Sequence, residues 1–540
     1  MTWSRSRSAS IRRRRSSAFL AAFLLAPLGA AQVSRVWVAD NRDGTYKNPV
    51  LHADYSDPDV VGVGDDFYMV ASSFDQAPGL PVLESKDLVN WRLIGHVFAD
   101  QPPADVYGNM QHGNGAWAPS IRYHNGEFYI YYPDPDFGLY LSKARNPAGP
   151  WSTPLLIKGV KGWIDPCPLW DEDGRAYLVH ALAASRASAK SILVVHRMSP
   201  DGTRLLDDGA IVYDGHAQDP GIEGPKFYKR NGYYYIFAPA GGIAPGWQLA
   251  LRSRSVWGPY ERRVVLAQGA TPVNGPHQGG WVETPRGESW FLHFQDKGAY
   301  GRVVHLQPMK WVDDWPVIGV NGEPVLTYNK PSVAGTWPMV TPPDSDEFNS
   351  PDLGLQWQWA ANPKPNWAFP SSALGCLRLF AVPPPPGARN LWDVPSLLTQ
   401  KFPAPEFTVT TKVTFSLSSN QDRAGLIVLG QDYAYIAVRK KAEGFDVYQA
   451  TATNAAGGAA EKESAPLPLK EKTVYLRVKV SAGAVCNFSY STDGSAFTAV
   501  ADAFQAKPGR WIGAKVGIFA AEAAQAHESG YADFDWFRVE

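Results

Sequence analysis

The 540-residue sequence contains only three cysteines, Cys167, Cys376 and Cys486. So few cysteines exclude a disulfide framework as the basis of the fold, although a bond between Cys376 and Cys486 in the C-terminal part stays an open alternative. The cysteines and histidines also form no group with the spacing of a zinc site. Because Cys167 follows Asp165 by two residues, we expect it to be a buried thiol beside a site and not a nucleophile.

The sequence also lacks an excess of charge of either sign. The 51 Lys and Arg residues nearly cancel the 52 Asp and Glu residues, which gives a formal net charge of −1 at pH 7. A nucleic-acid-binding protein would require a basic face, so we predict no nucleic-acid partner. Aromatic residues are abundant, with 20 Trp and 24 Tyr. Such numbers suit a β-sheet core and also the flat faces that carbohydrate sites use.

No long hydrophobic run marks a membrane anchor near the N-terminus. The apolar run 18–28 is about half of the roughly 20 residues that a spanning helix requires. It follows a basic run at 12–15 and precedes small residues at 29–31, which is the arrangement of a signal peptide. Residues 1–31 are therefore predicted to be a signal peptide for secretion or export to the periplasm, and the paired arginines also fit a twin-arginine route.

From about residue 48 to 320 the chain repeats one β design and shows no long helical period. Each copy has a short apolar strand, a turn and an aromatic-rich returning strand, and equivalent copies lie roughly 45 to 65 residues apart, a typical blade interval. The five copies begin at Ser56-Asp57-Pro58-Asp59, Ala118-Pro119-Ser120, Asp165-Pro166-Cys167, Glu223-Gly224-Pro225 and Gly279-Gly280-Trp281. We therefore predict a five-bladed β-propeller over residues 32–321.

The rest of the chain is predicted to be a linker and a second β domain, so the whole fold is all-β. Residues 322–345 contain five prolines and little periodicity, which indicates a stiff linker that packs along the propeller. From 346 to 540, alternating strand patterns and polar turns predict a β-sandwich. Acidic clusters at 346–347 and 533–535 bracket this domain and could hold a structural Ca²⁺, with two solvated turns as the alternative.

Three of the five copies open their first strand with a carboxylate: Asp57, Asp165 and Glu223. The first strand of each blade lines the propeller axis, so these side chains should converge. Inverting glycoside hydrolysis requires one protonated and one ionised carboxyl group, about 6.5–9.5 Å apart. Glu223 lies in an apolar sequence that suits the acid, Asp57 lies in a more polar loop that suits the base, and Asp165 would add a negative charge that keeps the acid protonated. A single Asp of this kind is often a turn residue, but three at equivalent positions favour function.

These motifs, in this order, resemble glycoside hydrolase family 43. The resemblance is carried by Asp57-Pro58, Trp117-Ala118-Pro119, Asp165-Pro166 and Glu223-Gly224-Pro225, and continues in Asn390-Leu391-Trp392-Asp393-Val394-Pro395 and Arg423-Ala424-Gly425-Leu426. It implies a five-bladed propeller with a concanavalin-like C-terminal domain, as in the β-xylosidase branch, with Asp57 as general base, Asp165 as modulator of the acid and Glu223 as general acid. Asp59 stands where the family commonly has Ser, which makes Asp59 a rival to Asp57.

The resemblance also implies further site residues. Phe74 and Trp117 match residues that wall the terminal sugar pocket, with core packing as the alternative. Arg302 matches an arginine that contacts the sugar, with a surface salt bridge as the alternative. His277 matches a histidine near the propeller axis that in some relatives helps to hold calcium or another ion through water, and an ordinary hydrogen-bonding histidine is the alternative. No organic cofactor is implied.

The sequence thus predicts a secreted, exo-acting, inverting glycosidase. It would remove terminal β-D-xylosyl or α-L-arabinofuranosyl residues from fragments of hemicelluloses such as xylan, arabinoxylan and arabinan. An endo-acting arabinanase, which would require an open groove, and a non-catalytic carbohydrate-binding propeller stay open as alternatives. A fructan-cleaving propeller enzyme is disfavoured, because it would be a retaining enzyme with a different first-blade motif, which is not found in this sequence. The choice between the two sugars and the oligomeric state are left open.

Overall fold

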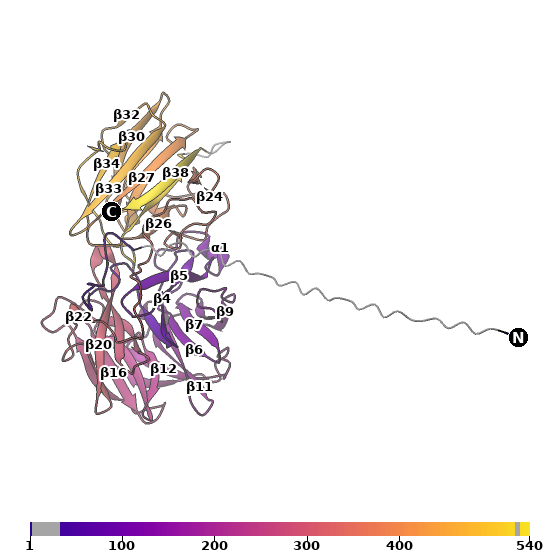
Figure 1. Ribbon diagram of the computed structural model, residues 1–540, viewed down its shortest axis with the longest axis vertical. Helices are drawn as coiled ribbons and strands as arrows, with labels where there is room; N and C mark the ends of the chain where they lie inside the picture. The colour runs from indigo at the N-terminus through magenta and orange to yellow at the C-terminus, as the bar shows by residue number, and fades with distance from the viewer. Residues whose placement is uncertain (3–32, 524–529) are drawn as a thin grey trace. The chain divides into compact units, whose positions relative to one another are not determined.

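The computed structural model describes residues 1–2, 33–523 and 530–540, and almost all of the predicted signal peptide, 1–31, lies outside the described residues. The described chain is nearly all-β, with two four-residue helices, α1 (Ala104–Tyr107) and α2 (Ala184–Ala187). Neither these helices nor any other in the described ranges is long and apolar enough to cross a membrane. Figure 1 shows the strands gathered into two parts, one formed by β2 to β21 and one by β23 to β38.

The first part is a propeller of five four-stranded antiparallel sheets, each built from consecutive strands. The first blade contains β2 (Asp59–Val63), β3 (Asp66–Val70), β4 (Gly79–Ser85) and β5 (Trp91–Phe98), and the second contains β6 (Ser120–His124), β7 (Glu127–Asp134), β8 (Gly138–Ala144) and β9 (Leu155–Gly159). The third contains β10 (Trp163–Trp170), β11 (Ala176–Leu182), β12 (Ile192–Met198) and β13 (Ala210–Asp214), and the fourth contains β14 (Lys226–Arg230), β15 (Tyr233–Ala240), β16 (Trp247–Ser253) and β17 (Glu261–Ala267). The fifth contains β18 (His277–Glu283), β19 (Ser289–Asp296), β20 (Arg302–Val312) and β21 (Trp315–Ile318). The predicted five-bladed propeller is confirmed.

Local sequence explains the hairpins that build the blades. Asn125 and Gly126 have φ of 49° and 82° between β6 and β7, and Asn231 and Gly232 have φ of 50° and 72° between β14 and β15. Two successive left-handed residues form the tight turn whose twist matches a β-hairpin, and Asn-Gly adopts it most readily. These dipeptides therefore fix where the first two strands of two blades reverse.

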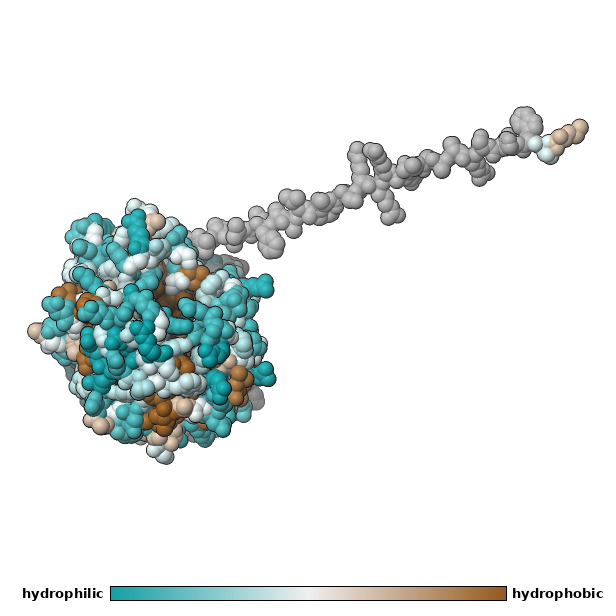
Figure 2. Space-filling model, turned by 90° about the horizontal axis from the view of Figure 1, so that it is seen from below, coloured by the Kyte–Doolittle hydropathy of each residue, from teal (hydrophilic) through white to brown (hydrophobic). Residues whose placement is uncertain are grey.

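The second strands are the most buried part of the blades, and the last strands vary in burial. The second strands are almost wholly buried, whereas β9 and β13 are mostly exposed. Side chains of the described chain on the face seen in Figure 2 are mainly hydrophilic, and its hydrophobic residues lie in separate small areas. The core thus lies between neighbouring blades and around the axis, where the first strands carry the candidate site residues.

The ring is closed by side chains and a small sheet, because each blade already contains its own four strands. β1 (Thr45–Lys47) pairs with β22 (Thr327–Asn329). The buried Asn48 side chain donates to the carbonyl oxygens of Leu306 and Val325 and accepts from the Leu306 N–H, each at 2.8 Å. Residues before the first blade are thereby fixed to the fifth blade and to the segment that follows it.

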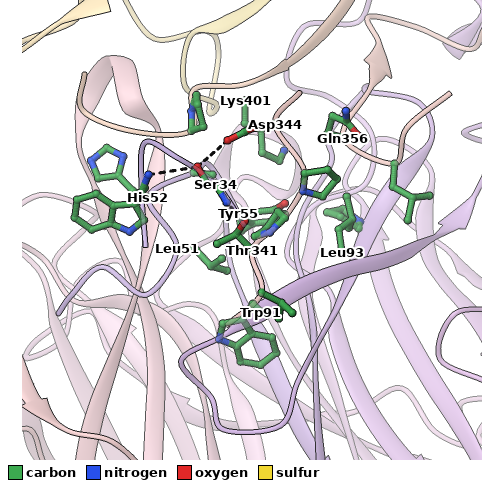
Figure 3. A pocket seen from close by; sticks show the side chains of 18 of the residues that line it. Ser34, Leu51, His52, Tyr55, Trp91, Leu93, Thr341, Asp344, Gln356 and Lys401 are labelled. Atoms are coloured by element: carbon green, nitrogen blue, oxygen red, sulfur yellow. Dashed lines mark hydrogen bonds between the residues drawn. The ribbon is translucent and has the colours of Figure 1, made fainter. Parts of the chain in front are cut away.

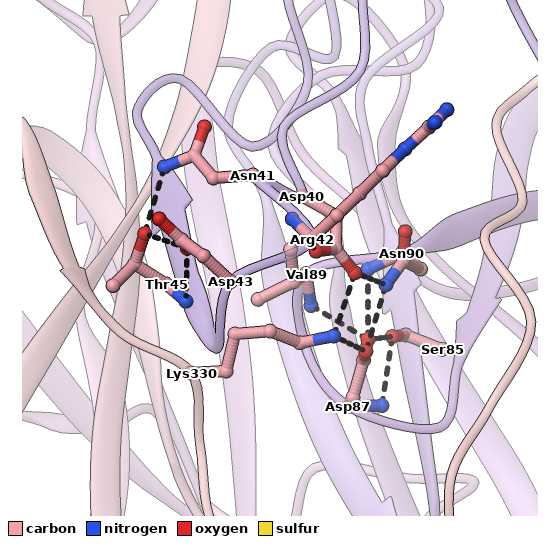
Figure 4. A network of polar contacts seen from close by, with 10 residues as sticks. All are labelled: Asp40, Asn41, Arg42, Asp43, Thr45, Ser85, Asp87, Val89, Asn90 and Lys330. Carbon is pink, nitrogen blue, oxygen red and sulfur yellow. Dashed lines mark hydrogen bonds and ion pairs between the residues drawn. The ribbon is translucent and has the colours of Figure 1, made fainter.

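A polar network attaches residues 322–345, which were predicted to be a linker, to the first blade (Figure 4). The Lys330 ammonium lies 2.6 Å from the Asp40 carboxylate and 3.0 Å from that of Asp87. Asn90 donates to the same two carboxylates at 3.0 and 2.8 Å. One lysine thus compensates two buried aspartates and holds this segment against the loop that precedes Trp91.

The second part is a sandwich of two eight-stranded sheets. One contains β23 (Gln358–Trp359), β26 (Leu398–Lys401), β28 (Arg423–Leu429), β29 (Tyr433–Lys440), β30 (Phe445–Ala452), β31 (Lys462–Glu463), β32 (Leu467–Leu469) and β37 (Lys515–Ala521). The other contains β24 (Ala368–Ser371), β25 (Cys376–Phe380), β27 (Phe407–Ser416), β33 (Thr473–Ser481), β34 (Val485–Ser491), β35 (Thr498–Ala499), β36 (Phe504–Gln505) and β38 (Tyr531–Val539). Side chains from both sheets form one buried cluster, so the predicted sandwich is confirmed.

The cysteines do not form the bond that the sequence left open. Cys376 in β25 and Cys486 in β34 are both buried and free. Strands β38, β27 and β33 lie between their two strands in the sheet, so the thiols are too far apart for a disulfide. The sandwich is therefore held by its core and not by a covalent crosslink of these residues.

Candidate active site

Two of the candidate carboxylates have an unusual backbone conformation. Asp57, just before β2, and Asp165, within β10, have φ of 54° and 57°, the left-handed region that is uncommon for residues other than glycine. Asp165 lies where the register of β10 and β11 breaks between Ile164 and Cys167. Such strained conformations persist where surrounding structure fixes them, and they cluster at functional sites.

The Asp57 carboxylate is held by two hydrogen-bond donors. Its Oδ1 accepts from Arg302 Nη1 at 2.8 Å and its Oδ2 from Ser72 Oγ at 2.6 Å. The Arg302 backbone N–H in turn donates to Asp54 Oδ1 at 2.9 Å, which fixes the start of β20. Arg302 therefore lies in the site against a predicted catalytic residue, and the alternative of a surface salt bridge is excluded because both partners are buried.

Asp165 and Glu223 come from neighbouring blades and are linked through one amide. The Gly224 N–H donates to Asp165 Oδ2 at 2.7 Å. Burial raises the pKa of Asp165 to about 7, and the negative charge of Glu223 adds to the rise, as does that of Asp57 to a smaller degree. Gly224 has φ of 60°, and a Cβ there would lie 2.8 Å from the Gln278 side chain, so only glycine fits this link. Glu223 and Asp57 thus both act electrostatically on Asp165.

The setting of Glu223 differs from the expectation. Its neighbours in sequence indicated an apolar surrounding, but its side chain is 36% exposed, and Asp165 is the more buried of the two. Glu223 Oε1 lies 2.9 Å from Nε2 of the buried His277. His277 is therefore a hydrogen-bonding partner of Glu223, which is the alternative that the sequence had left for a lone histidine.

Calcium is not supported at either predicted place. Within residues 33–523 and 530–540, no group of three His, Cys, Asp or Glu side chains could hold a metal ion. The carboxylates at the ends of the sandwich are in ion pairs: Glu347 with Arg538, Asp533 with Arg378, and Asp535 with Lys412. Asp346 instead accepts from Trp357 Nε1 at 2.9 Å. Because each carboxylate has a cationic or N–H partner, these residues do not fit a calcium site.

Asp59, the rival to Asp57, has a structural partner. It is fully buried in β2, and its Oδ2 accepts from Arg122 Nη1 at 2.6 Å and from the Ile121 N–H at 2.9 Å. Arg122 Nη2 also donates to Cys167 Sγ at 2.9 Å, and burial raises the pKa of that thiol. A layer of Asp59, Arg122 and Cys167 therefore lies across the axis beside the carboxyl groups, and Cys167 is the buried thiol that was expected.

Two of the predicted wall residues are in contact, and a third aromatic was missed. The rings of Phe74 and Trp117 lie 6.4 Å apart, edge to face. Trp511, from the sandwich loop between β36 and β37, lies 6.2 Å from the Trp117 ring, and 46% of its surface is exposed. The signal that could have found it is a tryptophan in the glycine-rich sequence Pro508-Gly509-Arg510-Trp511-Ile512-Gly513.

Trp511 belongs to a hollow to which both domains contribute. Its lining includes His112, Asp296 and Arg302 of the propeller and Trp392, Arg510 and Trp511 of the sandwich. The rings of His112 and Trp392 stack at 3.9 Å with an interplanar angle of 7°. Arg302 thus lines the hollow and also binds Asp57, one of the predicted catalytic carboxylates.

A second, largely apolar cavity (Figure 3) has none of these three carboxyl groups in its lining. It is lined by residues of the N-terminal segment, the first blade, residues 340–344 and the sandwich, among them His52, Trp91 and Lys401. Ser34 Oγ donates to Asp344 Oδ2 at 2.7 Å at its edge. Asp344 is the only carboxylate in its described lining, so this cavity lacks the pair that acid–base hydrolysis requires.

Comparison with known proteins agrees with this fold. Residues 46–316 match the model of Glycosyl hydrolases family 43, and residues 345–540 that of the beta xylosidase C-terminal concanavalin A-like domain. A candidate beta-xylosidase of Xylanibacter ruminicola is 44% identical over 492 residues, 88% of this chain and 86% of its own length. A non-reducing end alpha-L-arabinofuranosidase of Bacteroides ovatus is 29% identical over 91% of this chain and 94% of its own. The crystal structure of a xylan beta-1,4-xylosidase from Bacillus halodurans has a TM-score of 0.82 at 27% identity, covering 92% of this chain and 99% of that one.

The propeller, the carboxyl groups around its axis and the matched domains define a glycoside hydrolase. The chain belongs to Glycosyl hydrolases family 43, and its second domain is concanavalin-like.

Proposed function

We propose that the protein is an exported, exo-acting, inverting glycosidase that removes terminal β-D-xylosyl or α-L-arabinofuranosyl residues from oligosaccharides of xylan, arabinoxylan or arabinan. The names of its relatives, a beta-xylosidase and a non-reducing end alpha-L-arabinofuranosidase, support these two sugars. The basic run at 12–15 and the apolar run at 18–28 support export.

The carboxyl groups would divide the chemistry as follows. Asp57 takes a proton from a water molecule as that water attacks the anomeric carbon, and Glu223 gives a proton to the departing oxygen, so no net proton is needed. The observation that carries the assignment of base and acid is the side chain beside each carboxyl group. The Arg302 guanidinium binds the Asp57 carboxylate, whereas Glu223 acts electrostatically on a second carboxyl group, the buried Asp165.

The sandwich supports action at chain ends. Trp511, Arg510 and Trp392 cover one side of the hollow that contains Arg302, so a sugar chain would meet a wall where an open groove would let it pass through. An endo-acting enzyme requires such a groove. The exposed ring of Trp511 is also suited to stack on the sugar next to the cleaved bond.

Hydrolysis of nitrophenyl xyloside and nitrophenyl arabinofuranoside by wild type, Asp57→Ala and Glu223→Ala tests the roles. We expect kcat/KM to fall by about 10²- to 10⁴-fold in each variant. Asp65→Ala, at an exposed turn of the first blade, is the matched control and should keep wild-type activity. Wild-type rates in Glu223→Ala would overturn the acid assignment. Sugar binding without hydrolysis by the wild type would favour a non-catalytic binding protein.

Two product analyses test the remaining claims. NMR spectroscopy should show the anomer of inverted configuration first, and initial release of the retained anomer would contradict inversion. A xylohexaose digest should release monosaccharide from the first time point, whereas early di- and trisaccharides would indicate an endo-acting enzyme. N-terminal sequencing of the protein recovered outside the cytoplasm should begin near residue 32 if the leader is removed.

A further inference from the structure

A buried lysine on the propeller axis has no partner that explains it. Lys226, the first residue of β14, has no exposed surface, and its Nζ has no hydrogen-bond partner among the described residues. An isolated buried ammonium group is strongly disfavoured, so such a residue requires a compensating charge nearby. It lies three residues after Glu223, the proposed acid.

The chain path places Lys226 beside the third blade. On either side of it, the Gly224 N–H donates to Asp165 Oδ2 at 2.7 Å and the Phe227 N–H to Cys167 Sγ at 3.3 Å. The residue thus belongs to the stretch of β14 that runs along β10 at the axis. The positive charge of Lys226 opposes the rise in the pKa of Asp165 that burial and Glu223 produce.

The aspartates around the axis suggest what this lysine does. Asp57 has Arg302 at 2.8 Å, and Asp59 has Arg122 at 2.6 Å. Asp165 has no ion pair of that kind in the described residues, only the Gly224 amide and the electrostatic influence of Lys226. Since Lys226 Nζ makes no direct hydrogen bond in the described chain, a water molecule between the Lys226 ammonium group and the Asp165 carboxylate would connect them.

We propose that Lys226 is a positioning residue whose ammonium group compensates the buried negative charge of Asp165 and so holds this carboxylate ionised beside Glu223. The inference rests on the proposed function, in which Glu223 donates a proton and Asp165 is the charged group next to it. Without the lysine charge, Asp165 would bind a proton of its own and would lose its electrostatic effect on Glu223. The charged and titratable groups around the axis are Asp57, Asp59, Arg122, Asp165, Cys167, Glu223, Lys226, Tyr228, His277 and Arg302.

Replacement of Lys226 by methionine separates this role from a structural one. Loss of the positive charge raises the pKa of Asp165 further, so Asp165 becomes ionised only at higher pH. The acidic limb of the profile of kcat/KM against pH should therefore move to higher pH, and the plateau should fall. A merely loosened site would admit water, which weakens the effect of burial, and would move that limb the other way.

The leaving group provides the second readout. Dinitrophenolate departs without a proton, whereas the sugar released from xylobiose requires one. We expect Lys226→Met to lower kcat/KM for xylobiose by about 10²-fold and for dinitrophenyl xyloside by less than about threefold. Lys226→Arg, which keeps the charge, should restore much of the xylobiose activity. Lys229→Met is the control, because this lysine lies on the same strand but pairs with Asp171 and Glu172.

Parallel measurement of Glu223→Ala makes the outcomes distinct. Loss of xylobiose activity in Glu223→Ala but not in Lys226→Met would overturn this inference alone, and loss in neither would overturn the proposed function. Equal losses of Lys226→Met on both substrates would also overturn the inference. Lys226→Gln, a second neutral variant, is measured beside Lys226→Met. Failure of both variants to fold would assign the lysine a role in stability and would contradict the proposal.

Discussion

The Asp54 carboxylate of the propeller accepts a hydrogen bond from the Gly513 N–H of the sandwich, with 2.8 Å between Oδ2 and N. The other oxygen of Asp54 accepts from the Arg302 N–H and from Ser56 Oγ. One side chain therefore fixes the loop of Asp57, the start of β20 and the loop that carries Trp511. The concanavalin-like domain is thus attached to the catalytic end of the propeller and contributes to its pocket.

Trp511→Ala should weaken the use of oligosaccharides more than the use of aryl glycosides. Loss of one exposed aromatic face removes about 1 to 2 kcal/mol, or roughly 5- to 30-fold in kcat/KM for xylotriose. Gly513→Ala should have a similar effect, because its Cβ would lie 2.7 Å from the Gly301 nitrogen and displace the loop. Trp337→Ala, at an exposed tryptophan of residues 322–345, is the control. Unchanged xylotriose kinetics in Trp511→Ala would remove this residue from the site.

Asp57→Asn and Asp59→Asn should differ in their effect on activity. Asp57→Asn removes the proposed base, so kcat should fall by about 10³-fold, and it also leaves the buried Arg302 without its partner, so the melting temperature should fall as well. Asp59→Asn leaves Arg122 without its buried partner, which should cost about 3 kcal/mol of unfolding free energy while the folded protein keeps activity. Activity assays and thermal unfolding of both variants check this. The reverse pattern would make Asp59 the base.

The repeat explains why so much of the propeller could be predicted from the sequence. A blade is a local unit of four consecutive strands, so its turns and the carboxylates that open its first strand recur along the chain. Asp57, Asp165 and Glu223 were identified from that recurrence, and the structure brings Glu223 and Asp165 together through Gly224. The prediction that the three carboxylates converge used one long-range feature, the position of the first strand of each blade at the propeller axis.

The missed features depend on contacts between segments far apart in sequence. Nothing in residues 508–513 indicates that this loop would lie against Trp117, because that contact depends on how the two domains dock. The expectation for Glu223 used its sequence neighbours, but its exposure is set by the opening of the site, and its partner is His277 from another blade. The burial of Asp165 likewise comes from the neighbouring blade and not from its own strand.

Asp165→Asn should make the protein more stable at neutral pH while it lowers activity. The pKa of Asp165 is raised from 3.8 to about 7 in the folded state, so the folded protein binds this proton more tightly than the unfolded chain. Its contribution to stability is present below pH 3.8 and is lost as pH rises through about 7. Asparagine has no such proton, so the variant should gain on the order of 2 kcal/mol over wild type at pH 8 and little at pH 4. Unfolding in urea at both pH values measures the gain, with the exposed Asp65→Asn as control.

Asn48→Ala should weaken the closure of the ring of blades. The first and fifth blades pack against each other through β2 and β18, and Asn48 adds three hydrogen bonds with Leu306 and Val325 where the ring closes. Its loss leaves buried backbone groups without a partner, which should cost about 2 to 4 kcal/mol. Thermal unfolding should show a lower transition, and hydrogen exchange of β1 and β22 should accelerate before that of β27 and β33 in the sandwich. Asn41→Ala, which removes an exposed bond to Thr45, is the matched control. An unchanged transition in Asn48→Ala would show that β1 and β22 suffice to close the propeller without this side chain.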